Sequence, residues 1–552
     1  MREQPPNMTD YLETRASFRL EVPEVYNYAR DVVDDWAARE PDKLALLAVG
    51  PDGDEVGRFS FADLAASSNR AARFLQSLGV GKGDPVFVML PRIHEWYDVV
   101  LGCIKLGAVP MPGTTLLTDR DIAYRMEHAR SRVAVTDPEG MAKVDRAAER
   151  MGVELTRACV RADGAGLDGW ASWEEGLAAA SEQPPEVEPT RSDDPMLVYF
   201  TSGTVAYPKM VLHTQASLGI GHQITARFWQ DLKPTDLHWT LSDFGWAKAA
   251  WGKLFGQWAV GAANFLWDAR GKPDFDLILR MIGQHRISTF CAPPTVYRAL
   301  VQLDLAAYDW SGLRHCVSAG EPLNPEVIKV WRDATGLTVY DGYGQTETVN
   351  LLANYRCMEV RPGSMGKPTP GFDVCVVDDD GEVLGPRQEG HVAVRVSPER
   401  PVGLFREYWR DPEATAGAFR GDWYYTGDRA EVDEDGYFWF VGRSDDVIIS
   451  AAYRIGPFEV ESALVEHVAV AEAAVVGKPD EQRGQIVKAF VILAPGHAGS
   501  AELVAELQDH CKRVSAPYKY PREIEFVDEL PKTISGKIRR VELREREEQR
   551  TS

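Results

Sequence analysis

The chain has 552 residues, of which 44% are hydrophobic and 26% charged, as is typical of a soluble globular protein with several domains. Its 83 acidic and 61 basic residues give a net charge of −22. This charge argues against nucleic acid or an anionic membrane as the main partner, because both bind basic surfaces. Lysines interrupt the most apolar regions, 99–112 and 249–267, so we expect no membrane span.

The N-terminal stretch MREQPPNMTDYLETR carries acidic residues and no apolar run, so we do not expect it to be a secretory signal. The 7 cysteines are scattered, without CxxC or CxxxxH spacing. A dispersed, odd set of cysteines in a long chain is typical of reduced thiols packed in a protein interior. The sequence therefore predicts a cytoplasmic protein without a zinc site.

The first half of the chain alternates helical and strand-like segments. Residues 61–79, FADLAASSNRAARFLQSLG, have helical periodicity and end at a glycine. Short apolar runs then recur along the chain: DPVFVML, RVAVTD, DPMLVYFTS, STFCAPP and HCVSAG. Short β runs that alternate with helices indicate an α/β fold with parallel sheets.

The pattern changes after about residue 350, where FDVCVVDDDGEVL, GHVAVRV and GYFWFVGR are typical of short strands joined by Asp/Gly turns. Mixed helices and strands begin near GRSDD, at residues 442–446. We predict a large N-terminal body over 1–443, with two α/β subdomains over about 30–345 and a small β-barrel-like subdomain over about 346–441. A mobile α+β C-terminal domain is predicted over 444–552.

The stretch TSGTVAYPKM, residues 201–210, follows the apolar run MLVYF. Its hydroxyl residues and glycine can surround an anion with donors, and its lysine adds a positive charge. It is not the P-loop pattern GxxxxGK[ST], and taken alone an ordinary surface turn is an equal alternative. Five further stretches follow in order: SAGEPL (318–323), YDGYGQTET (340–348), YYTGDRA (424–430), GRSDDVII (442–449) and PKTISGKIRR (531–540).

Together these six stretches resemble the motifs of the adenylate-forming acyl- and aryl-CoA synthetase superfamily, over nearly the whole chain. The motifs most resemble those of medium-chain (butyrate-type) acyl-CoA synthetases, as seen in YFTSGT, YPKM, YGQTET, YRIGPFEVESAL and APYKYP. The resemblance implies a ligase of fatty acid metabolism whose cofactors are ATP, Mg²⁺ and coenzyme A. The carboxylate attacks the α-phosphorus of ATP to give acyl-AMP and pyrophosphate, and the CoA thiol then displaces AMP.

The resemblance also assigns roles to residues. It implies that Lys537, Thr346 and Glu347 are catalytic, that Glu347 binds Mg²⁺, and that Asp428 accepts hydrogen bonds from the ribose. The implied ATP and AMP site consists of Thr201, Ser202, Gly203, Thr204, Lys209, Gly320, Glu321, Pro322, Tyr343, Gly344, Thr346, Asp428 and Arg443.

For the second half-reaction the resemblance implies that the C-terminal domain rotates about a hinge at Asp445. The implied CoA site consists of Ala451, Ala452, Tyr453, Arg483 and Tyr520. Many members of the superfamily carry glycine where this chain has Ala206 and Ala452. The extra methyl group at Ala452 is expected to narrow the path of the thiol.

Two residues indicate which carboxylic acids fit the site. Acetate-specific relatives place a tryptophan where this chain has Gly344, so we expect space for several carbons there, and Trp246 is expected to wall the acyl pocket. Short- to medium-chain fatty acids are the predicted substrates. Open alternatives are a benzoate-type aryl-CoA ligase and an acyl-AMP ligase with a carrier-protein acceptor. No basic residue is obviously placed for a dicarboxylate, although Lys248 and Lys253 leave that substrate class open. A homo-oligomer is also left open.

Overall fold

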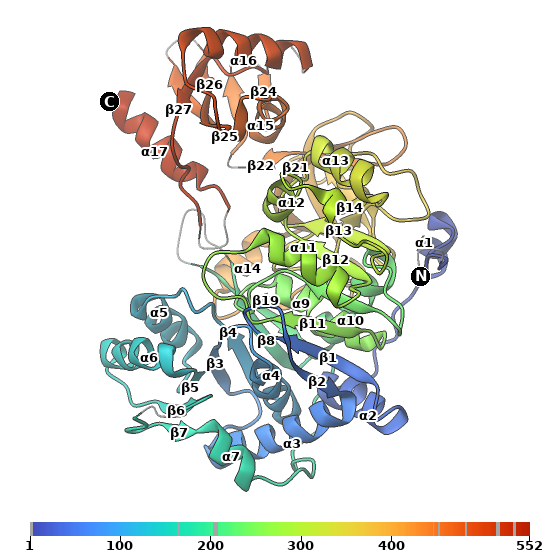
Figure 1. Cartoon of the computed structure of the whole chain (residues 1–552), viewed down its shortest axis with the longest axis vertical. Coiled ribbons are helices and arrows are strands. Elements are labelled where there is room, and N and C mark those ends of the chain that lie inside the picture. Colours follow the sequence, from blue (N-terminus) through green and yellow to red (C-terminus); the bar gives the residue numbers. More distant parts are fainter. Residues whose placement is uncertain are drawn as a thin grey trace.

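The computed structural model describes residues 4–162, 166–201, 208–444, 446–450, 453–480, 483–514, 519–533 and 537–551. Figure 1 shows a large body, formed by the N-terminal and middle parts of the chain, with the C-terminal part above it. No helix in these described ranges is long and apolar enough to cross a membrane. The predicted α/β fold class is confirmed, and its first sheet is parallel throughout.

That first sheet has the described strand order β4-β3-β5-β6-β7. Helix α3, which packs against α4, begins at a capping box between Ser60 and Asp63 and ends at Ser77, just before Gly79 at φ +87°. Its strands are β3 (Pro85–Met89), β4 (Val109–Pro112), β5 (Val133–Thr136), β6 (Thr156–Cys159) and β7 (Ala171–Ser172), and its helices α3 (Phe61–Ser77), α4 (Glu95–Leu106), α5 (Asp119–Ala129), α6 (Pro138–Met151) and α7 (Trp173–Ala179).

The second sheet has nine strands among the described residues, in the order β16-β15-β14-β13-β12-β10-β11-β1-β2. Strands β1 and β10 to β14 run parallel, so their carboxyl ends share one edge. Its strands are β1 (Leu44–Val49), β2 (Glu55–Ser60), β10 (Leu237–Thr240), β11 (Ala263–Trp267), β12 (Thr289–Ala292), β13 (His315–Ala319), β14 (Val339–Tyr343), β15 (Leu352–Ala353) and β16 (Lys367–Pro368).

Helices pack on this second sheet or close to it. They are η1 (Ala29–Asp34), α2 (Asp35–Arg39), η2 (Gln215–Ile220), α8 (His222–Ile224), η3 (Thr225–Trp229), α9 (Lys248–Gly252), α10 (Phe255–Ala259), α11 (Phe275–Gln284), α12 (Pro294–Leu300), η4 (Leu305–Ala307) and α13 (Pro325–Thr335). The N-terminal helix α1 (Tyr11–Ser17) lies on the outside of the body (Figure 1).

Two smaller sheets complete the body. One joins β8 (Pro195–Phe200), β9 (Met210–Thr214) and β19 (Glu407–Tyr408), and α14 (Pro412–Ala418) follows it. The other is the β-rich unit that the Asp/Gly turns predict. Its strands are β17 (Val374–Val377), β18 (Gly390–Arg395), β20 (Phe419–Arg420), β21 (Trp423–Val432) and β22 (Phe438–Arg443), and the described pairs are antiparallel.

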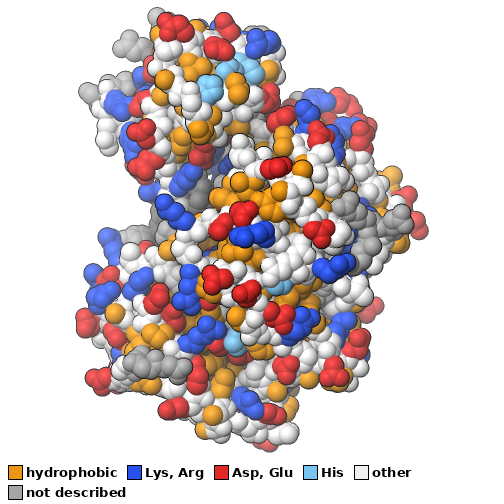
Figure 2. Space-filling view, in the orientation of Figure 1, with side chains coloured by type: hydrophobic (Ala, Val, Ile, Leu, Met, Phe, Trp, Pro, Cys, Tyr) orange, Lys and Arg blue, Asp and Glu red, His pale blue; other side chains and the backbone are white. Residues whose placement is uncertain are grey.

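The C-terminal part has a sheet of its own, with helices packed on it (Figure 1). Its elements are β23 (Ile448–Ser450), β24 (Tyr453–Ile455), β25 (Val470–Asp480), β26 (Gly484–Leu493), β27 (Glu523–Phe526), α15 (Pro457–Val465), α16 (Ala501–Val514) and α17 (Arg540–Thr551). Although the net charge is strongly negative, Figure 2 shows Lys and Arg side chains on this face where the C-terminal part meets the body.

Candidate active site

Two motifs meet at the carboxyl edge of the nine-stranded sheet. SAGEPL continues β13 and YGQTET continues β14, and these neighbouring parallel strands pair Ala319 with Gly342. Gly320, at φ +110°, adopts a backbone conformation that favours glycine, and this turns Glu321 and Pro322 away from the sheet. Ligands of open α/β sheets bind at this edge, so the fold itself makes it the candidate site.

Asp428 lies at the centre of a buried hydrogen-bond cluster, the Asp428 network, formed by Tyr343, Gln345, Asp428 and Arg443. Asp428 is 4% exposed. Its Oδ2 accepts hydrogen bonds from the Tyr343 hydroxyl at 2.5 Å and from Gln345 Nε2 at 2.8 Å. Arg443 Nη1 lies 3.3 Å from the other oxygen, Oδ1, because Asp428 and Arg443 are paired in register across β21 and β22.

Burial raises the pKa of Asp428, and the charge of Arg443 and the hydrogen bond from Tyr343 act in the opposite direction. The hydroxyl of Tyr424 holds Gln345 in place by donating to its Oε1 at 2.9 Å. The Tyr343 ring, which the resemblance assigns to stacking on adenine, is thus oriented by its hydroxyl toward Asp428. Among the described residues, Oδ1 of Asp428 is contacted by Arg443 alone.

Glu347 forms a second polar group with Tyr408 and Lys209. It is 8% exposed, and its Oε1 accepts a hydrogen bond from the Tyr408 hydroxyl at 2.8 Å. The ammonium of Lys209 lies 4.4 Å from the centroid of the Tyr408 ring. Burial raises the pKa of Glu347, which the hydrogen bond from Tyr408 lowers in part. Tyr408 therefore connects the candidate metal ligand with the lysine of the phosphate motif.

The phosphate motif spans the connection between β8 and β9. Its two ends are joined by reciprocal hydrogen bonds: Thr201 N–H donates to Lys209 O at 3.0 Å, and Lys209 N–H donates to Thr201 Oγ1 at 3.0 Å. Ser202, Gly203 and Thr204 lie outside the described residues, as does Ala206. Thr346 is anchored nearby, because His213 Nε2, 2.8 Å away, donates to its carbonyl oxygen. Burial lowers the pKa of His213 to about 4, so this histidine is neutral.

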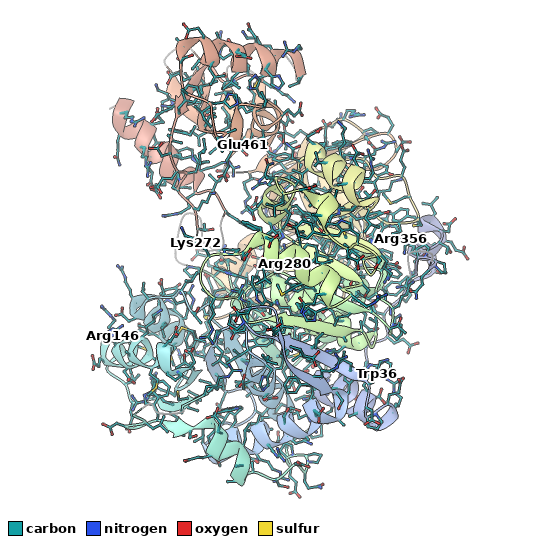
Figure 3. All side chains as sticks on the ribbon, viewed as in Figure 1. Trp36, Arg146, Lys272, Arg280, Arg356 and Glu461 are labelled. Carbon is teal, nitrogen blue, oxygen red and sulfur yellow. The ribbon has the colours of Figure 1, made fainter. Side chains whose placement is uncertain are left out.

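Lys537 approaches this cluster from the C-terminal part. Its side chain is exposed, and its backbone N–H donates to Thr533 Oγ1 at 3.1 Å. Its charge nevertheless helps to lower the pKa of Asp428 and acts on the buried Lys248. The segment after Lys537 is tied down by Arg540, whose Nη2 donates to Glu461 Oε2 at 2.7 Å; Figure 3 labels Glu461 at the junction with the body.

The predicted CoA residues are spread over the C-terminal part. The backbone N–H of Arg483 donates to Asp480 Oδ1 at 2.9 Å, and its side chain is exposed. Tyr520 is half-buried, with Lys512 Nζ 4.6 Å from its ring centroid. Tyr453 belongs to β24, and its side chain is outside the described set. Asp445, Ala451 and Ala452 lie outside the described residues as well.

The acyl side differs from the sequence prediction in one respect. A Cβ atom at Gly344 would lie 2.4 Å from Trp251 Cη2, so the space beside this glycine is occupied. The expectation of open space at Gly344 is therefore corrected, because the indole of Trp251, on α9, fills this space. Trp246 is half-buried and precedes the same helix. Lys248, on α9, donates to Ala319 O and lies beside Gly320.

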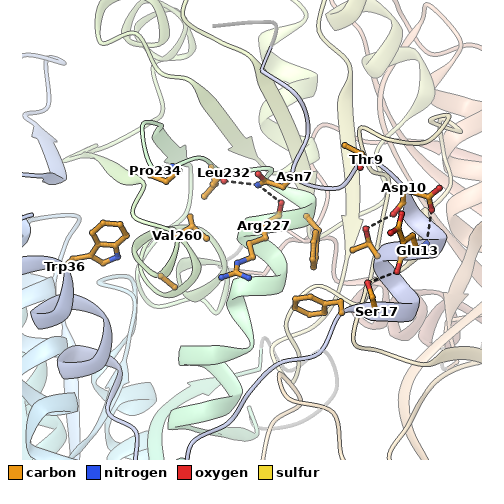
Figure 4. A pocket seen from close by; sticks show the side chains of 14 residues that line it. Asn7, Thr9, Asp10, Glu13, Ser17, Trp36, Arg227, Leu232, Pro234 and Val260 are labelled. Carbon is orange, nitrogen blue, oxygen red and sulfur yellow. Dashed lines mark hydrogen bonds between the residues drawn. The ribbon is translucent and has the colours of Figure 1, made fainter. Parts of the chain in front are cut away.

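Two described cavities lie away from these motifs. One of about 680 Å³ lies beneath the N-terminal segment and is lined by Asn7, Glu13, Trp36 and Arg227 among others (Figure 4). The other, of about 280 Å³, is lined by Arg92, His94, Arg161 and Arg270 among others. None of the predicted site residues lines either cavity. No cluster of three metal-ligating side chains occurs in the part of the chain that the structure describes.

Several residues of the site escaped the sequence prediction. Gln345 lies inside the QTET motif, so the motif itself contained that signal. Tyr424 opens the YYTGDRA motif, whereas Tyr408 belongs to a strand with no recognisable motif, and only the fold brings these hydroxyls to Gln345 and Glu347. Trp251 follows Trp246 within two turns, and no sequence signal distinguished it from core residues.

The AMP-binding enzyme family matches residues 33–409, and the AMP-binding enzyme C-terminal domain matches residues 459–537. The chain belongs to the AMP-binding enzyme family.

Named relatives cover almost the whole chain. The acyl-coenzyme A synthetase ACSM3, mitochondrial, of Mus musculus is 45% identical over 98% of this chain and 94% of its own length. The acyl-coenzyme A synthetase ACSM4, mitochondrial, of Homo sapiens is 48% identical over 95% and 91%. Among solved structures, the anthranilate CoA ligase AuaEII in complex with anthranoyl-AMP has a TM-score of 0.86 and 31% identity, covering 95% of this chain and 98% of that chain.

These comparisons confirm the predicted resemblance, and they confirm that the enzyme is an acyl-CoA synthetase, for which ATP and CoA are substrates. They contradict the predicted cytoplasmic location. Both named relatives are described as mitochondrial, so that prediction, which rested on dispersed cysteines and on the N-terminal composition, is wrong. Neither feature distinguishes one reducing compartment from another, which is the reason for the error.

Proposed function

We propose that this enzyme converts short- to medium-chain fatty acids to CoA thioesters in two steps at the edge of β13 and β14. In the first step a carboxylate oxygen attacks the α-phosphorus of ATP, and the bond to pyrophosphate breaks. In the second step the CoA sulfur attacks the acyl carbon, AMP leaves, and the thiol proton is released. The observation that carries the proposal is that described residues of these motifs lie around two buried carboxylates, Asp428 and Glu347.

The nucleotide is held by groups that the body already positions. The part of the site that binds adenine is lined by Gly320, Glu321 and Pro322. Asp428 accepts hydrogen bonds from the ribose hydroxyls. A carboxylate has about four acceptor positions, and Tyr343, Gln345 and Arg443 use three of them. We infer that a ribose hydroxyl takes the place of the Tyr343 hydroxyl, which releases the Tyr343 ring to lie against the purine.

Thr201 and Lys209 bind the β- and γ-phosphates, with the intervening motif residues. Glu347 fits Mg²⁺, because this ion is usually bound by one or two carboxylates together with substrate phosphates, and Glu347 is a buried carboxylate near Lys209. When bound, Mg²⁺ neutralises charge on the phosphates. Tyr408 keeps the Glu347 carboxylate oriented and ionised by donating a hydrogen bond.

Lys537 stabilises the negative charge that builds up as the carboxylate attacks phosphorus. A charge aimed at the reacting atoms, rather than at the ground state, is the most effective form of electrostatic catalysis. The acyl chain extends from this point along α9, where Trp251 and Trp246 limit its length. Arg483 and Tyr520 are proposed to bind the nucleotide end of CoA after the C-terminal domain, residues 444–552, has rotated about Asp445.

The test is pyrophosphate release with ATP and Mg²⁺, using acids from acetate to decanoate and benzoate, with and without CoA. We expect stimulation to be greatest between butyrate and octanoate, with thioester formed only when CoA is added. Maximal stimulation by benzoate would contradict the substrate class. Pyrophosphate release without thioester would contradict CoA as the acceptor.

A further inference from the structure

A buried cation lies next to the proposed acyl site without a partner. Lys253 follows α9 directly, and its side chain is 2% exposed. Its ammonium lies 5.4 Å from the centroid of the Phe244 ring, and it makes no hydrogen bond or ion pair with any described residue. Burial, helped by the charge of Arg92, lowers the pKa of Lys253 to about 7, and an anion beside the amine would favour its charged form. A buried polar group without a partner is costly, so a protein retains one chiefly where a ligand or a function requires it.

The charges that face Lys253 do not neutralise it. Arg92 and Asp243 are the nearest charged groups, so two cations share a single carboxylate. Arg92 is also influenced by Asp268, but its described hydrogen bond goes to a carbonyl: Nη2 donates to Ala269 O at 2.5 Å. The other neighbour, His238, is uncharged, because burial lowers its pKa to about 3.

Hydrogen-bond donors are also in excess around Phe244. The Trp96 ring stacks on Phe244 with centroids 4.0 Å apart, and the Tyr97 ring lies 5.5 Å from it. The hydroxyls of Tyr97 and Tyr199 and the indole N–H of Trp96 are buried and have no partner among the described residues. A region rich in donors and positive charge is complementary to an acceptor-only anion, and a carboxylate is such a group.

The cavity of about 280 Å³ adjoins the same residues, because Arg92 lines it. Two other guanidinium groups line it, but each has a carboxylate partner: Arg161 Nε lies 2.6 Å from Glu95, and Arg270 Nη2 lies 3.1 Å from Asp268. Arg92 has no ion pair within the described residues. The excess positive charge is therefore localised at Arg92 and Lys253.

Helix α9 connects Lys253 with the proposed acyl site. Lys253 comes two residues after Trp251, the indole that fills the space beside Gly344. Lys248, at the other end of α9, lies beside Gly320, on the proposed adenine side of the site. The charges of Lys248 and Lys253 both act on Cys291, so this side chain is within electrostatic reach of both lysines.

We propose that Lys253 and Arg92 form a subsite for a distal carboxylate, so that the substrates include medium-chain dicarboxylic acids. One carboxylate reacts at Lys537, and the other is bound at Lys253 and Arg92 without any change in its bonds. This inference rests on the proposed function, because the reaction at the first carboxylate is the same.

The test compares octanoate, suberate and monomethyl suberate in thioester formation by the full chain. Suberate and its monoester have the same backbone length and differ in the distal charge. We expect kcat/KM for suberate to exceed that for the monoester by about tenfold or more, the effect of one buried charge-assisted contact. In Lys253→Met this ratio is expected to fall close to one while octanoate is unaffected, and Lys253→Arg is expected to restore part of it.

A suberate-to-monoester ratio that is the same in wild type and Lys253→Met would overturn the subsite. If Lys253→Met does not fold, the melting temperature of the wild type gives a second reading: suberate must raise it more than the monoester does, and equal shifts would also overturn the subsite. Arg92→Met is expected to reduce the same ratio. Octanoate distinguishes the two proposals, because its failure as a substrate would refute the proposed function, whereas suberate discrimination tests the subsite alone.

Discussion

The proposed ribose ligand, Asp428, and the proposed catalytic lysine, Lys537, differ in burial and in the hydrogen bonds of their side chains. Asp428 is 4% exposed and lies among Tyr343, Gln345 and Arg443, all from the body. Lys537 is exposed, and its described hydrogen bonds are made by its backbone, with Thr533. The comparison indicates that the proposed nucleotide site is preformed in the body. The charge proposed to act at the transition state is supplied only when the C-terminal part is in place.

The largest expected effect follows from removing Lys537. Lys537→Ala should reduce acid-dependent pyrophosphate release by about 10²- to 10³-fold, because a preorganised charge at the reacting centre is lost. Thioester formation from synthetic acyl-AMP and CoA should change little, and so should the melting temperature, since the side chain is exposed. An equal loss in both half-reactions would show that Lys537 acts beyond adenylation.

A smaller, different effect is expected on the body side of the comparison. Asp428→Asn should raise KM for ATP by about 10- to 100-fold, because charge-assisted hydrogen bonds to the ribose and to Arg443 weaken. It should also lower the melting temperature, unlike Lys537→Ala. Tyr343→Phe is the matched control: if its hydroxyl only occupies the ribose position, KM for ATP should stay within a few-fold of wild type. Unchanged stability in Asp428→Asn would contradict a preformed network.

The pH dependence of adenylation tests the pair of Glu347 and Tyr408. The hydrogen bond from Tyr408 favours the ionised carboxylate, so Tyr408→Phe should raise the pKa of Glu347 further above its ordinary value. Activity that needs ionised Glu347 is lost as pH falls through this pKa. The acid limb of kcat/KM for ATP should therefore move to higher pH in the variant, measured at saturating Mg²⁺. If the acid limb of the pH profile does not move, Glu347 is not a ligand of the metal.

The smallest effects are expected on the acyl side. Trp251→Ala should shift the preferred acid to longer chains, with a gain of about 0.8 kcal/mol for each methylene that becomes buried. Gly344→Ala should destabilise the protein in the wild-type background and be tolerated with Trp251→Ala, because the Cβ atom clashes with the indole. Thermal melts of the two single variants and the double variant measure this coupling.

The sequence predicted much of this architecture because its signals are local. SAGEPL and QTET directly follow apolar strands, and parallel strands place such segments on one edge. Asp428 and Arg443 were likewise identified through TGD and GRSDD.

Residues that long-range pairing brings together were not predictable. Tyr408 reaches Glu347 because β19 pairs with β9, almost 200 positions earlier, where Glu407 faces Leu212. Open space was expected beside Gly344, and the indole of Trp251, on α9, occupies it. Lys253 was noted in the sequence for its charge, and its burial was not predictable from the sequence.

The pairing of Asp428 with Arg443 has a consequence for how this enzyme tolerates genetic change. The hairpin that joins β21 to β22 turns at Asp433, whose Oδ1 accepts hydrogen bonds from Asp435 N–H at 3.0 Å and Tyr437 N–H at 2.9 Å. An insertion or deletion there shifts the register, and a one-residue shift turns a strand's side chains to the opposite face. An insertion or deletion in this surface turn would thus abolish ATP binding although no site residue had been replaced. The length of the turn is therefore constrained by a binding site that the turn does not contact.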